Sequence, residues 1–425
     1  MKKKKAPLVR RMKEFVKTSV VWGPLDHNLF FTIIFLNVYG IIMVYSASYN
    51  NSITKNYSYF MNNQLKNVIF GFVIMIVASY VNYHRIVRLG WGWFWLLAAV
   101  AIIAALKTPL AHSELGATRW IKLGPVSFQA AEPIKAAIII FFAYYVSYWG
   151  LNRWYNQLLA CLLAIALLGF LFFFSNNLST VIVLFCICAV IILSSVKKPD
   201  LYWYFLIGLA LIIIAAIGVT VYLLMHQGAE NFRFVRIRAW LHPEEYAADE
   251  GLQAMQARYA IGAGGFWGKG LGQSLIKFKL SYSYNDFILA IICEELGVFG
   301  VIVMMTLFGY LLYRIYKIAQ NAWDIEGKVL AIGVFTQIAL QLLINVMVVT
   351  SVIPTTGVTL PFFSAGGTSV VFLLAELGMV LNVDKYAKER RFFEEAERHV
   401  AQMEQRGGIG AAGWRRRLDS ARTRR

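Results

Sequence analysis

The chain has 425 residues, of which 59% are hydrophobic and only 15% are charged. So few charged side chains cannot cover the surface of a soluble globular protein, so the composition indicates an integral membrane protein. The formal net charge of +18 could by itself suggest nucleic-acid binding. However, the basic residues stand at the ends of apolar runs and in the two tails, and not on a folded polar domain. We therefore expect no nucleic-acid partner.

Apolar runs of the length that crosses a bilayer, about twenty residues, recur along the chain. They are candidate spans at residues 28–48, 65–83, 90–106, 133–150, 156–174, 177–195, 201–225, 286–316, 326–350 and 365–383. The first run is too long for the core of a signal peptide, so we predict an uncleaved helix there. The sequence thus predicts an all-α polytopic membrane protein with about ten transmembrane helices.

Three regions follow from these spans. A basic N-terminal segment covers residues 1–27, the membrane domain covers 28–383, and a C-terminal tail covers 384–425. A large loop, residues 227–285, separates the seventh and eighth predicted helices. Short cytoplasmic loops collect Lys and Arg, and placing the N terminus inside puts most of the 41 basic residues on that side. The prediction is that both termini are cytoplasmic and the large loop is extracytoplasmic.

The C-terminal tail begins with a stretch of acidic and basic residues at 384–405, which predicts a surface helix. A glycine-rich linker and a basic end follow it. Such a tail fits attraction to anionic lipid, and it also fits docking of a cytoplasmic partner. The sequence leaves both explanations open.

Cysteine and histidine usage offers no site. The four cysteines fall inside apolar runs without metal-type spacing, so we interpret them as packing residues. The six histidines are scattered along the chain, and neither a zinc site nor a Ser/His/Asp arrangement follows from them.

A first cluster of polar residues precedes the fourth predicted span. It contains Arg119 and Lys122, followed by Glu132 and Lys135 around Pro133. Glu132 and Pro133 suit the first turn of a helix, so capping alone explains them. Lys135, three residues after Glu132, lies on the same helical face and within pairing distance. A Glu132–Lys135 pair that lines a wet cavity is the functional alternative.

A second cluster belongs to the large loop. It contains Arg236 and the stretch 262–274, in which six glycines surround Lys269. Closely spaced glycines let backbone N–H groups approach an anion, as in phosphate-binding loops. No Walker A and no G-x-G-x-x-G motif is present. Tight turns in a re-entrant loop and binding of a phosphorylated lipid therefore both remain explanations.

The third cluster, residues 352–369, directly precedes the last predicted span. Its two prolines and its Gly and Ser residues, Ser364, Gly366 and Gly367 among them, rule out a regular transmembrane helix. Irregular backbone at membrane depth is tolerated only where protein or water covers it. We therefore predict that this segment lines a cavity.

Asp286 stands where the large loop meets the eighth predicted span. A carboxylate at that position is either a helix cap or a participant in chemistry, and Asn285 would cap equally well. Deeper in the same span lie Glu294 and Glu295, which face different sides of a helix. Two buried acids need partners, and Lys135 is one candidate.

These motifs together resemble the SEDS family (shape, elongation, division and sporulation) over residues 28–383. The matching stretches are Met43-Val-Tyr-Ser-Ala-Ser48, Arg119-Trp-Ile121, Gly262-Ala-Gly-Gly265, Gly268-Lys-Gly-Leu-Gly272, Asp286-Phe-Ile, Glu294-Glu-Leu-Gly297 and the segment 354–369. The Gly-Val-Thr-Leu-Pro form in the last stretch resembles the division branch more than the elongation branch. Where the family carries a Pro-Asp acid this chain has Asn177, while the essential aspartate is retained at Asp286.

The resemblance implies a peptidoglycan glycosyltransferase that polymerises lipid II during cell division, embedded in the bacterial inner membrane. It implies as partners a class B penicillin-binding transpeptidase and other membrane proteins of the division machinery. A lipid II transporter and a non-catalytic scaffold are the alternatives.

The resemblance also implies roles for single residues. Asp286 would act as general base or as ligand of a divalent cation, Mg²⁺ or Mn²⁺. The remaining candidates for substrate binding are Arg119, Lys122, Glu132, Lys135, Arg236, Lys269, Ser364, Gly366 and Gly367. Among these, the cations would contact the diphosphate, and the residues at 364–367 would shape the cavity.

Overall fold

The computed structural model describes residues 21, 23–48, 59–114, 117–123, 126–175, 177–196, 232–245, 250–278, 280, 284–365, 367–405 and 415. The helices of the first half are α2 (His27–Ser48), α3 (Tyr59–Tyr80), α4 (Tyr83–Val87), α5 (Trp93–Ala105), α6 (Ala131–Trp149), α7 (Trp154–Ser175) and α8 (Leu178–Ser195). Those of the second half are α10 (Phe232–Leu241), α11 (Glu250–Gly264), α12 (Ile288–Gln320), α13 (Ile325–Val349) and α14 (Thr368–Gln405). Short 3₁₀ turns lie at Leu89–Gly92 and Ile276–Phe278.

Every predicted span except one coincides with a helix. The exception, 201–225, lies outside the described residues, as do most of 1–27 and most of the tail after residue 405. Among the described helices, α2, α3, α7, α8, α12 and α13 are long and apolar enough to cross a bilayer. The polytopic helical architecture is therefore confirmed, while the number of ten spans stays a prediction.

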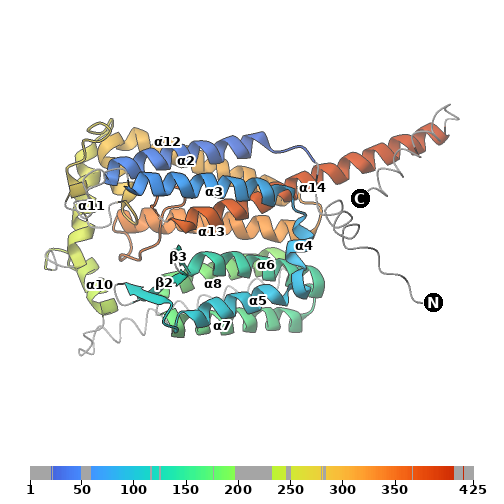
Figure 1. The fold of residues 1–425 in the computed structure, drawn as a ribbon, viewed down its shortest axis with the longest axis horizontal. Helices are drawn as coiled ribbons and strands as arrows, with labels where there is room; N and C mark the ends of the chain where they lie inside the picture. Colours follow the sequence, from blue (N-terminus) through green and yellow to red (C-terminus); the bar gives the residue numbers. More distant parts are fainter. Residues whose placement is uncertain are drawn as a thin grey trace.

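The long helices lie side by side in one bundle (Figure 1). At one end α10 and α11 lie across the helix ends, and at the other end α14 projects beyond the bundle. The end with α10 and α11 also carries the segment before α14, because Gln64 near the start of α3 donates to the carbonyl of Ser364. Val21, the first described residue, bonds the carbonyl of Tyr80 at the opposite end of α3. The predicted polar clusters thus gather at one end of the bundle.

The prediction of an all-α protein is wrong in one detail. A small antiparallel sheet, with strands in the order β1 (Ala111–Glu114), β2 (Ala117–Leu123) and β3 (Val126–Gln129), stands between α5 and α6. Its central strand contains Thr118, Trp120 and Ile121, residue types that are enriched in β-strands. The sheet is too short to show in a search for membrane spans.

Helix α14 crosses the predicted boundary between membrane domain and tail without a break. It runs from Thr368 to Gln405, so the predicted surface helix at 384–405 is the second half of one continuous helix. No proline or glycine follows Gly378 within it, and Glu, Lys, Arg and Ala are strong helix formers. Gly378 itself packs closely against α3, where an added Cβ would stand 2.5 Å from the carbonyl oxygen of Met75.

Candidate active site

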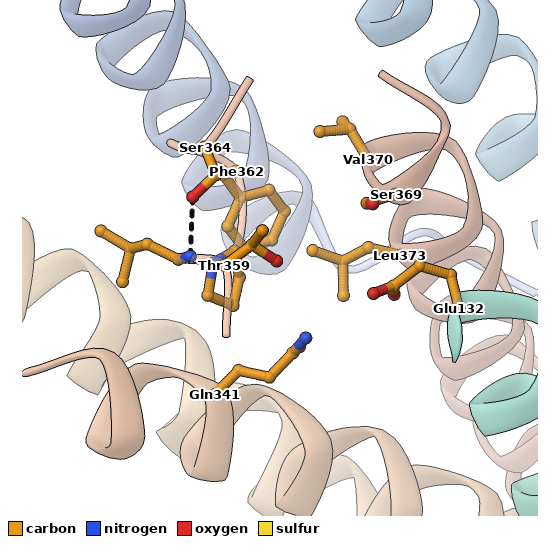
Figure 2. Close-up of a pocket in the computed structure, with 10 residues that line it drawn as sticks. Glu132, Gln341, Thr359, Phe362, Ser364, Ser369, Val370 and Leu373 are labelled. Atoms are coloured by element: carbon orange, nitrogen blue, oxygen red, sulfur yellow. Dashed lines mark hydrogen bonds between the residues drawn. The ribbon is translucent and has the colours of Figure 1, made fainter. Parts of the chain in front are cut away.

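A small cavity lies where α6, α13 and α14 meet the segment before α14. Figure 2 shows the amide of Gln341 and the carboxylate of Glu132 on two sides of this space. Its lining residues are Glu132, Gln341, Thr359, Leu360, Pro361, Phe362, Ser364, Ser369, Val370 and Leu373. The prediction that the proline- and glycine-containing segment lines a cavity is therefore confirmed.

A second cavity continues the first toward the start of α8. The two share Glu132, Gln341 and Thr359. The second is further lined by Gln129, Ala131, Lys135, Asn177, Ser179, Thr180, Val183, Gly357 and Val358. We refer to the two together as the Glu132 cavity.

Glu132 and Lys135 form the predicted ion pair. Lys135 Nζ lies 2.7 Å from Glu132 Oε2, and the two residues are only 3% and 4% exposed. Glu132 stands in the first turn of α6, where the helix dipole favours a negative charge. Removing one partner of such a buried pair leaves an uncompensated charge, which is strongly destabilising. Both residues line the Glu132 cavity. Capping of α6 would explain Glu132 but not the buried Lys135.

A second buried acid, Glu376, contacts Gln337, which stands one turn of α13 before Gln341. Glu376 of α14 is 1% exposed, and Gln337 Nε2 donates to its Oε2 at 2.8 Å. Within the described residues, neither Glu376 Oε1 nor Gln337 Oε1 has a hydrogen-bond partner. The charges of Lys135 and Glu132 both act on Glu376. Neither Glu376 nor Gln337 lines the Glu132 cavity, but Gln337 stands one turn of α13 from Gln341, which does.

Sequence reasoning missed the contribution of α13. Its amide residues Gln337, Gln341 and Asn345 recur at intervals of four and so lie on one helical face. All three are buried inside an otherwise apolar span. Buried amides at this spacing cost free energy unless they meet polar groups, so the pattern was a readable signal of a polar site.

Asp286 lies in a turn that is tied to the cavity wall by its backbone. Asn345 Nδ2 donates to the carbonyl oxygens of Asp286 and Val358, each at 2.9 Å. Ser364 Oγ donates to the carbonyl of Asn285 at 2.9 Å and accepts the N–H of Leu360 at 2.7 Å. These bonds fix the turn between α13 and the segment before α14.

The alternative that Asp286 serves as a helix cap is wrong. Helix α12 begins at Ile288, its N-cap residue is Phe287, and no side chain caps it. Asp286 is half-buried, one residue outside the cap position. It is not among the residues that line the Glu132 cavity, but Asn345, which holds its carbonyl, stands one turn of α13 from Gln341. The backbone of Asp286 is thus tied next to the cavity, outside the cap position of α12.

Lys135, which was one candidate partner for Glu294 and Glu295, pairs with Glu132 instead, and the need of the two acids for partners is met by other residues. Lys269 Nζ lies 2.7 Å from Glu294 Oε1, and Ser274 Oγ donates to the other oxygen. The N–H groups of residues 275 and 276 donate to Glu294 as well. Lys269, a predicted diphosphate contact, is therefore paired with Glu294, although its side chain is still 32% exposed.

Glu295 is also buried and also has hydrogen-bond donors around its carboxylate. Ser46 Oγ donates to it at 2.5 Å, the N–H of Ser274 donates at 3.3 Å, and Lys277 Nζ lies 3.5 Å away. Glu294 and Glu295 are both 0% exposed. We call Glu294, Glu295 and their partners the Glu294 cluster.

The glycine-rich stretch packs along the start of α12. The N–H groups of Lys269 and Gly270 donate to the carbonyls of Glu294 and Glu295, each at 2.9 Å. A Cβ on Gly268 would stand 2.2 Å from the carbonyl oxygen of Glu295. These amides are already bonded, so the structure favours tight turns and close packing over a phosphate cradle.

Helix α12 accommodates this contact with a kink at Gly297. The residue has φ 65°, a left-handed conformation that glycine adopts most readily. A Cβ there would lie 2.4 Å from the nitrogen of Gly268. Two N–H groups just after the kink donate back to residues 265 and 266. The Glu294-Glu-Leu-Gly297 motif thus packs closely against the glycine-rich stretch at residues 265–270.

The remaining candidates are placed as follows. Lys122 is exposed on β2 next to buried Ile121, and Arg119 belongs to the same strand. Arg236 belongs to α10. Gly367 has φ 51°, which suits glycine before α14, and Gly366 lies outside the described residues. The structure therefore brings Glu132, Lys135 and Ser364 into one cavity, with the Asp286 turn beside it.

The predicted divalent cation was tested against the oxygen atoms near Asp286. Among the described residues, no group of three or more His, Cys, Asp or Glu side chains is arranged to hold a metal. Next to Asp286, however, Asn285 Oδ1 and Asn345 Oδ1 are buried without hydrogen-bond partners. Mg²⁺ commonly uses one or two carboxylates and completes its shell with water and substrate phosphate. Amide oxygens are donors of the type that such a cation uses, and the cation stays a prediction.

Comparison with known proteins gives relatives along almost the entire chain. A protein of Trichlorobacter lovleyi named probable peptidoglycan glycosyltransferase FtsW is 33% identical, with 88% of this chain and 96% of the relative covered. The Bacillus subtilis protein of the same name is 32% identical, with 85% and 91% covered. Stage V sporulation protein E of Bacillus subtilis is 33% identical, with 84% and 96% covered.

Solved structures confirm the fold. A chain of a structure titled "Structural coordination of polymerization and crosslinking by a peptidoglycan synthase complex" superposes with a TM-score of 0.72 at 23% identity, covering 86% of this chain and 99% of that one. The rod shape determining protein RodA of Thermus thermophilus gives a TM-score of 0.61 at 22% identity, with 86% and 98% covered. The family model of FtsW/RodA/SpoVE cell cycle proteins matches residues 26–389. The expected family is thereby confirmed: this chain belongs to the FtsW/RodA/SpoVE family.

Proposed function

We propose that this protein is a peptidoglycan glycosyltransferase that polymerises lipid II into glycan strands on the outer face of the bacterial cytoplasmic membrane during cell division. The observation that carries the proposal is the similarity, over most of the chain, to relatives named probable peptidoglycan glycosyltransferase FtsW. The polar cavity at one end of the bundle supports it, because chemistry on a lipid-linked sugar needs polar groups at the membrane surface.

In the proposed reaction the 4-hydroxyl oxygen of the acceptor sugar attacks the anomeric carbon of the donor. The bond from that carbon to the diphosphate oxygen breaks, and the lipid diphosphate leaves with the electron pair. Asp286 takes the hydroxyl proton as general base, which typically contributes about 10²–10⁴ in rate. Hydrogen bonds to the carbonyls of Asn285 and Asp286 hold this turn, so the backbone that carries the Asp286 side chain is held in place.

The cationic side of the site is proposed to be Lys135. Its ammonium is buried at the cavity wall and oriented by Glu132 at 2.7 Å, so a diphosphate in the cavity would meet a preorganised positive charge. Arg119, Lys122 and Arg236 stay candidates for more peripheral contacts. Lys269 is assigned to the Glu294 cluster instead.

A divalent cation, Mg²⁺ or Mn²⁺, is proposed beside Asp286, with the amide oxygens of Asn285 and Asn345 as further donors. When bound, it would neutralise charge that develops on the leaving diphosphate. Asp286 as base and Asp286 as ligand are separate alternatives, and chelation tests distinguish them.

We propose the membrane topology that the basic residues indicate. Ten spans with both termini in the cytoplasm place α10, α11 and the Glu132 cavity at the outer surface. The start and end of the described bundle support this arrangement, because Val21 lies at the same end of α3 as Lys385 of α14. A cysteine introduced at exposed Lys122 should react with an impermeant maleimide in intact spheroplasts. Reaction only after permeabilisation would overturn the topology.

A transpeptidase partner is part of the proposal. Among the described residues, helices account for most of the chain, and no second globular domain that could cross-link peptides accompanies the bundle. We therefore propose a class B penicillin-binding protein as partner, together with other membrane proteins of the division machinery. The similar chain from a synthase complex that couples polymerisation to crosslinking supports this.

Reconstitution with labelled lipid II tests the function. The purified chain and its partner, with the transpeptidase blocked by penicillin, should form a ladder of glycan strands on a gel. Movement of lipid II between vesicle leaflets without polymer would identify a transporter instead. Polymer that forms only after a separate polymerase is added would identify a scaffold.

A further inference from the structure

An apolar cavity lies at the opposite end of α3 from the Glu132 cavity. It is lined by Leu25, Phe30, Met75, Ile76, Ser79, Tyr80 and Leu381, and its volume is about 190 Å³. An apolar cavity of about 150 Å³ is enough to bind benzene. Gln64 and Ser79 are fifteen residues apart on α3, which at about 1.5 Å per residue places this cavity roughly 22 Å from the Ser364 segment. It is therefore separate from the proposed active site.

The cavity has an outlet to the surface of the bundle. Ile76 and Tyr80 stand one turn apart on α3 and are 46% and 40% exposed, although both line the cavity. Val73 and Val77 of the same helix are 55% and 57% exposed. Exposed aliphatic side chains on a transmembrane helix face hydrocarbon. Molecules that enter this cavity therefore come from the bilayer.

A buried cation, Lys385, lies behind the wall of this cavity and contacts two of its lining residues. Lys385 of α14 is 1% exposed, its Nζ lies 3.4 Å from Ser79 Oγ, and it stands 3.3 Å over the Tyr80 ring. Ser79 and Tyr80 both line the cavity, and Leu381 stands one turn before Lys385. Ser79, a polar residue of the cavity wall, is thus also the residue that accepts a hydrogen bond from Lys385.

Within the described residues, Lys385 has no carboxylate partner. The adjacent Asp384 pairs with Lys388 at 2.6 Å, and Asp26 pairs with Arg314. An ammonium group carries three N–H donors, and the single hydrogen bond to Ser79 is long. Burial of a charge with so few partners is costly unless an anion joins it. An external anion at this position would therefore stabilise the buried ammonium group.

We propose that this cavity binds one anionic phospholipid, with an acyl chain between α2, α3 and α14 and the head-group phosphate accepting hydrogen bonds from Lys385. The apolar lining selects a lipid over a free phosphate, because a small anion would leave the cavity walls unsatisfied. Basic pockets between membrane helices bind lipid head groups in this way. This site does not depend on the proposed polymerase activity.

Native mass spectrometry of the full chain in micelles tests the proposal, with dioleoyl phosphatidylglycerol and dioleoyl phosphatidylethanolamine added in equal amounts. One phosphatidylglycerol molecule should stay bound preferentially. Lys385→Met should lower its retention by at least about fivefold, the value of one lysine–phosphate contact. Lys388→Met, which removes a neighbouring lysine paired with Asp384, should leave retention unchanged. Equal retention in Lys385→Met and wild type would overturn the proposal.

A second variant keeps the lysine and closes the cavity. Ile76→Trp should fill the apolar space and lower phosphatidylglycerol retention, whereas Val77→Trp, on the exposed face beside it, should not. Glycerol phosphate, which has the head group without chains, should fail to compete at the same concentration. Effective competition by it would show that the cavity has no role and would contradict the lipid assignment.

Discussion

The Glu132 cavity and the Glu294 cluster lie at the same end of the bundle and hold buried charges in two different ways. In the Glu294 cluster the two acids receive donors from side chains and from backbone N–H groups. Next to the Glu132 cavity, Glu376 Oε1, Gln337 Oε1 and Asn345 Oδ1 are buried and have no donor among the described residues, although none of these three residues lines the cavity itself. A satisfied network rigidifies a fold, whereas unsatisfied groups are tolerated where a ligand will meet them. The contrast separates an architectural joint from a reaction site.

Replacing one acid in each region should have the largest effects, on stability in the Glu294 cluster and on activity at the Glu132 cavity. Glu295→Gln leaves Lys277 buried beside a neutral side chain, and we expect a loss of about 3–5 kcal/mol in stability. Glu132→Gln should destabilise less, because Lys135 lines the Glu132 cavity, where water can solvate its ammonium group. Its activity should fall by at least about tenfold through the misplaced ammonium group. Thermal unfolding in detergent and polymerisation per folded molecule measure the two effects.

The two variants would contradict the account if their effects were exchanged. A fully stable Glu295→Gln with no polymerase activity would place the chemistry in the Glu294 cluster. Glu132→Gln with the activity of wild type would remove the cavity from the reaction.

Much of the fold was readable from the sequence because apolar length is a strong signal. The spans around α2, α7, α12 and α13 coincide with helices within a few residues. The Glu132–Lys135 pair followed from helical spacing, which is a local property. The partners of Glu294 and Glu295 did not follow, because Ser46 and Lys277 reach Glu295 across long sequence separations that only tertiary packing decides.

The sheet around β2 was missed for a different reason. A strand of seven residues beside a membrane span contributes little to any hydropathy window. The polar face of α13 could have been found, since amides at intervals of four are visible in the printed sequence. The role of Asp286 came from resemblance to a family, and the structure adds only where its turn is anchored.

The α12 kink should be the next most sensitive position. Gly297→Ala imposes a Cβ 2.4 Å from the Gly268 nitrogen at a φ of 65°, so we expect a loss of about 1–3 kcal/mol or more. Gly309→Ala, in the same helix with nothing near the added Cβ, should be neutral or slightly stabilising. Thermal unfolding of both variants checks this. Equal midpoints would contradict the close packing of the kink.

A substitution at Ser364 tests whether the hydrogen bonds that hold the Asp286 turn matter for the reaction. Ser364→Ala removes the acceptor of the Leu360 N–H and the donor to the Asn285 carbonyl, so about 1–3 kcal/mol of stability should be lost. The Asp286 turn loses an anchor, and the polymerisation rate should fall more than the stability alone explains. Ser194→Ala, which removes only a bond within α8, is the control. A rate equal to that of the control would show that the anchor has no catalytic consequence.

The smallest effect concerns a charged cluster at the other end of the bundle. Burial opposes ionisation of Asp324, but hydrogen bonds with His84, the Gly327 N–H and Tyr83 outweigh it and lower the pKa of this carboxyl below its ordinary value of 3.8. The stabilisation is therefore complete above that value and is lost as the pH falls through the lowered pKa. Asp324 also caps α13, so Asp324→Asn should cost about 1 kcal/mol at pH 7.

Unfolding of Asp324→Asn and wild type across pH 7 to about 3 checks this assignment. The difference between the two proteins should shrink in the acidic part of that range. A constant difference down to the lowest pH would show that the charge on Asp324 contributes nothing.

The most direct test of the central claim is the rate at which Asp286→Asn polymerises labelled lipid II with its partner present. The account predicts a fall of about 10²–10⁴ at an unchanged unfolding midpoint. The same exchange at Asp324, at the far end of the bundle, should leave the rate near that of wild type. An Asp286→Asn protein that forms glycan strands as fast as wild type would contradict the assignment of this carboxylate to the reaction.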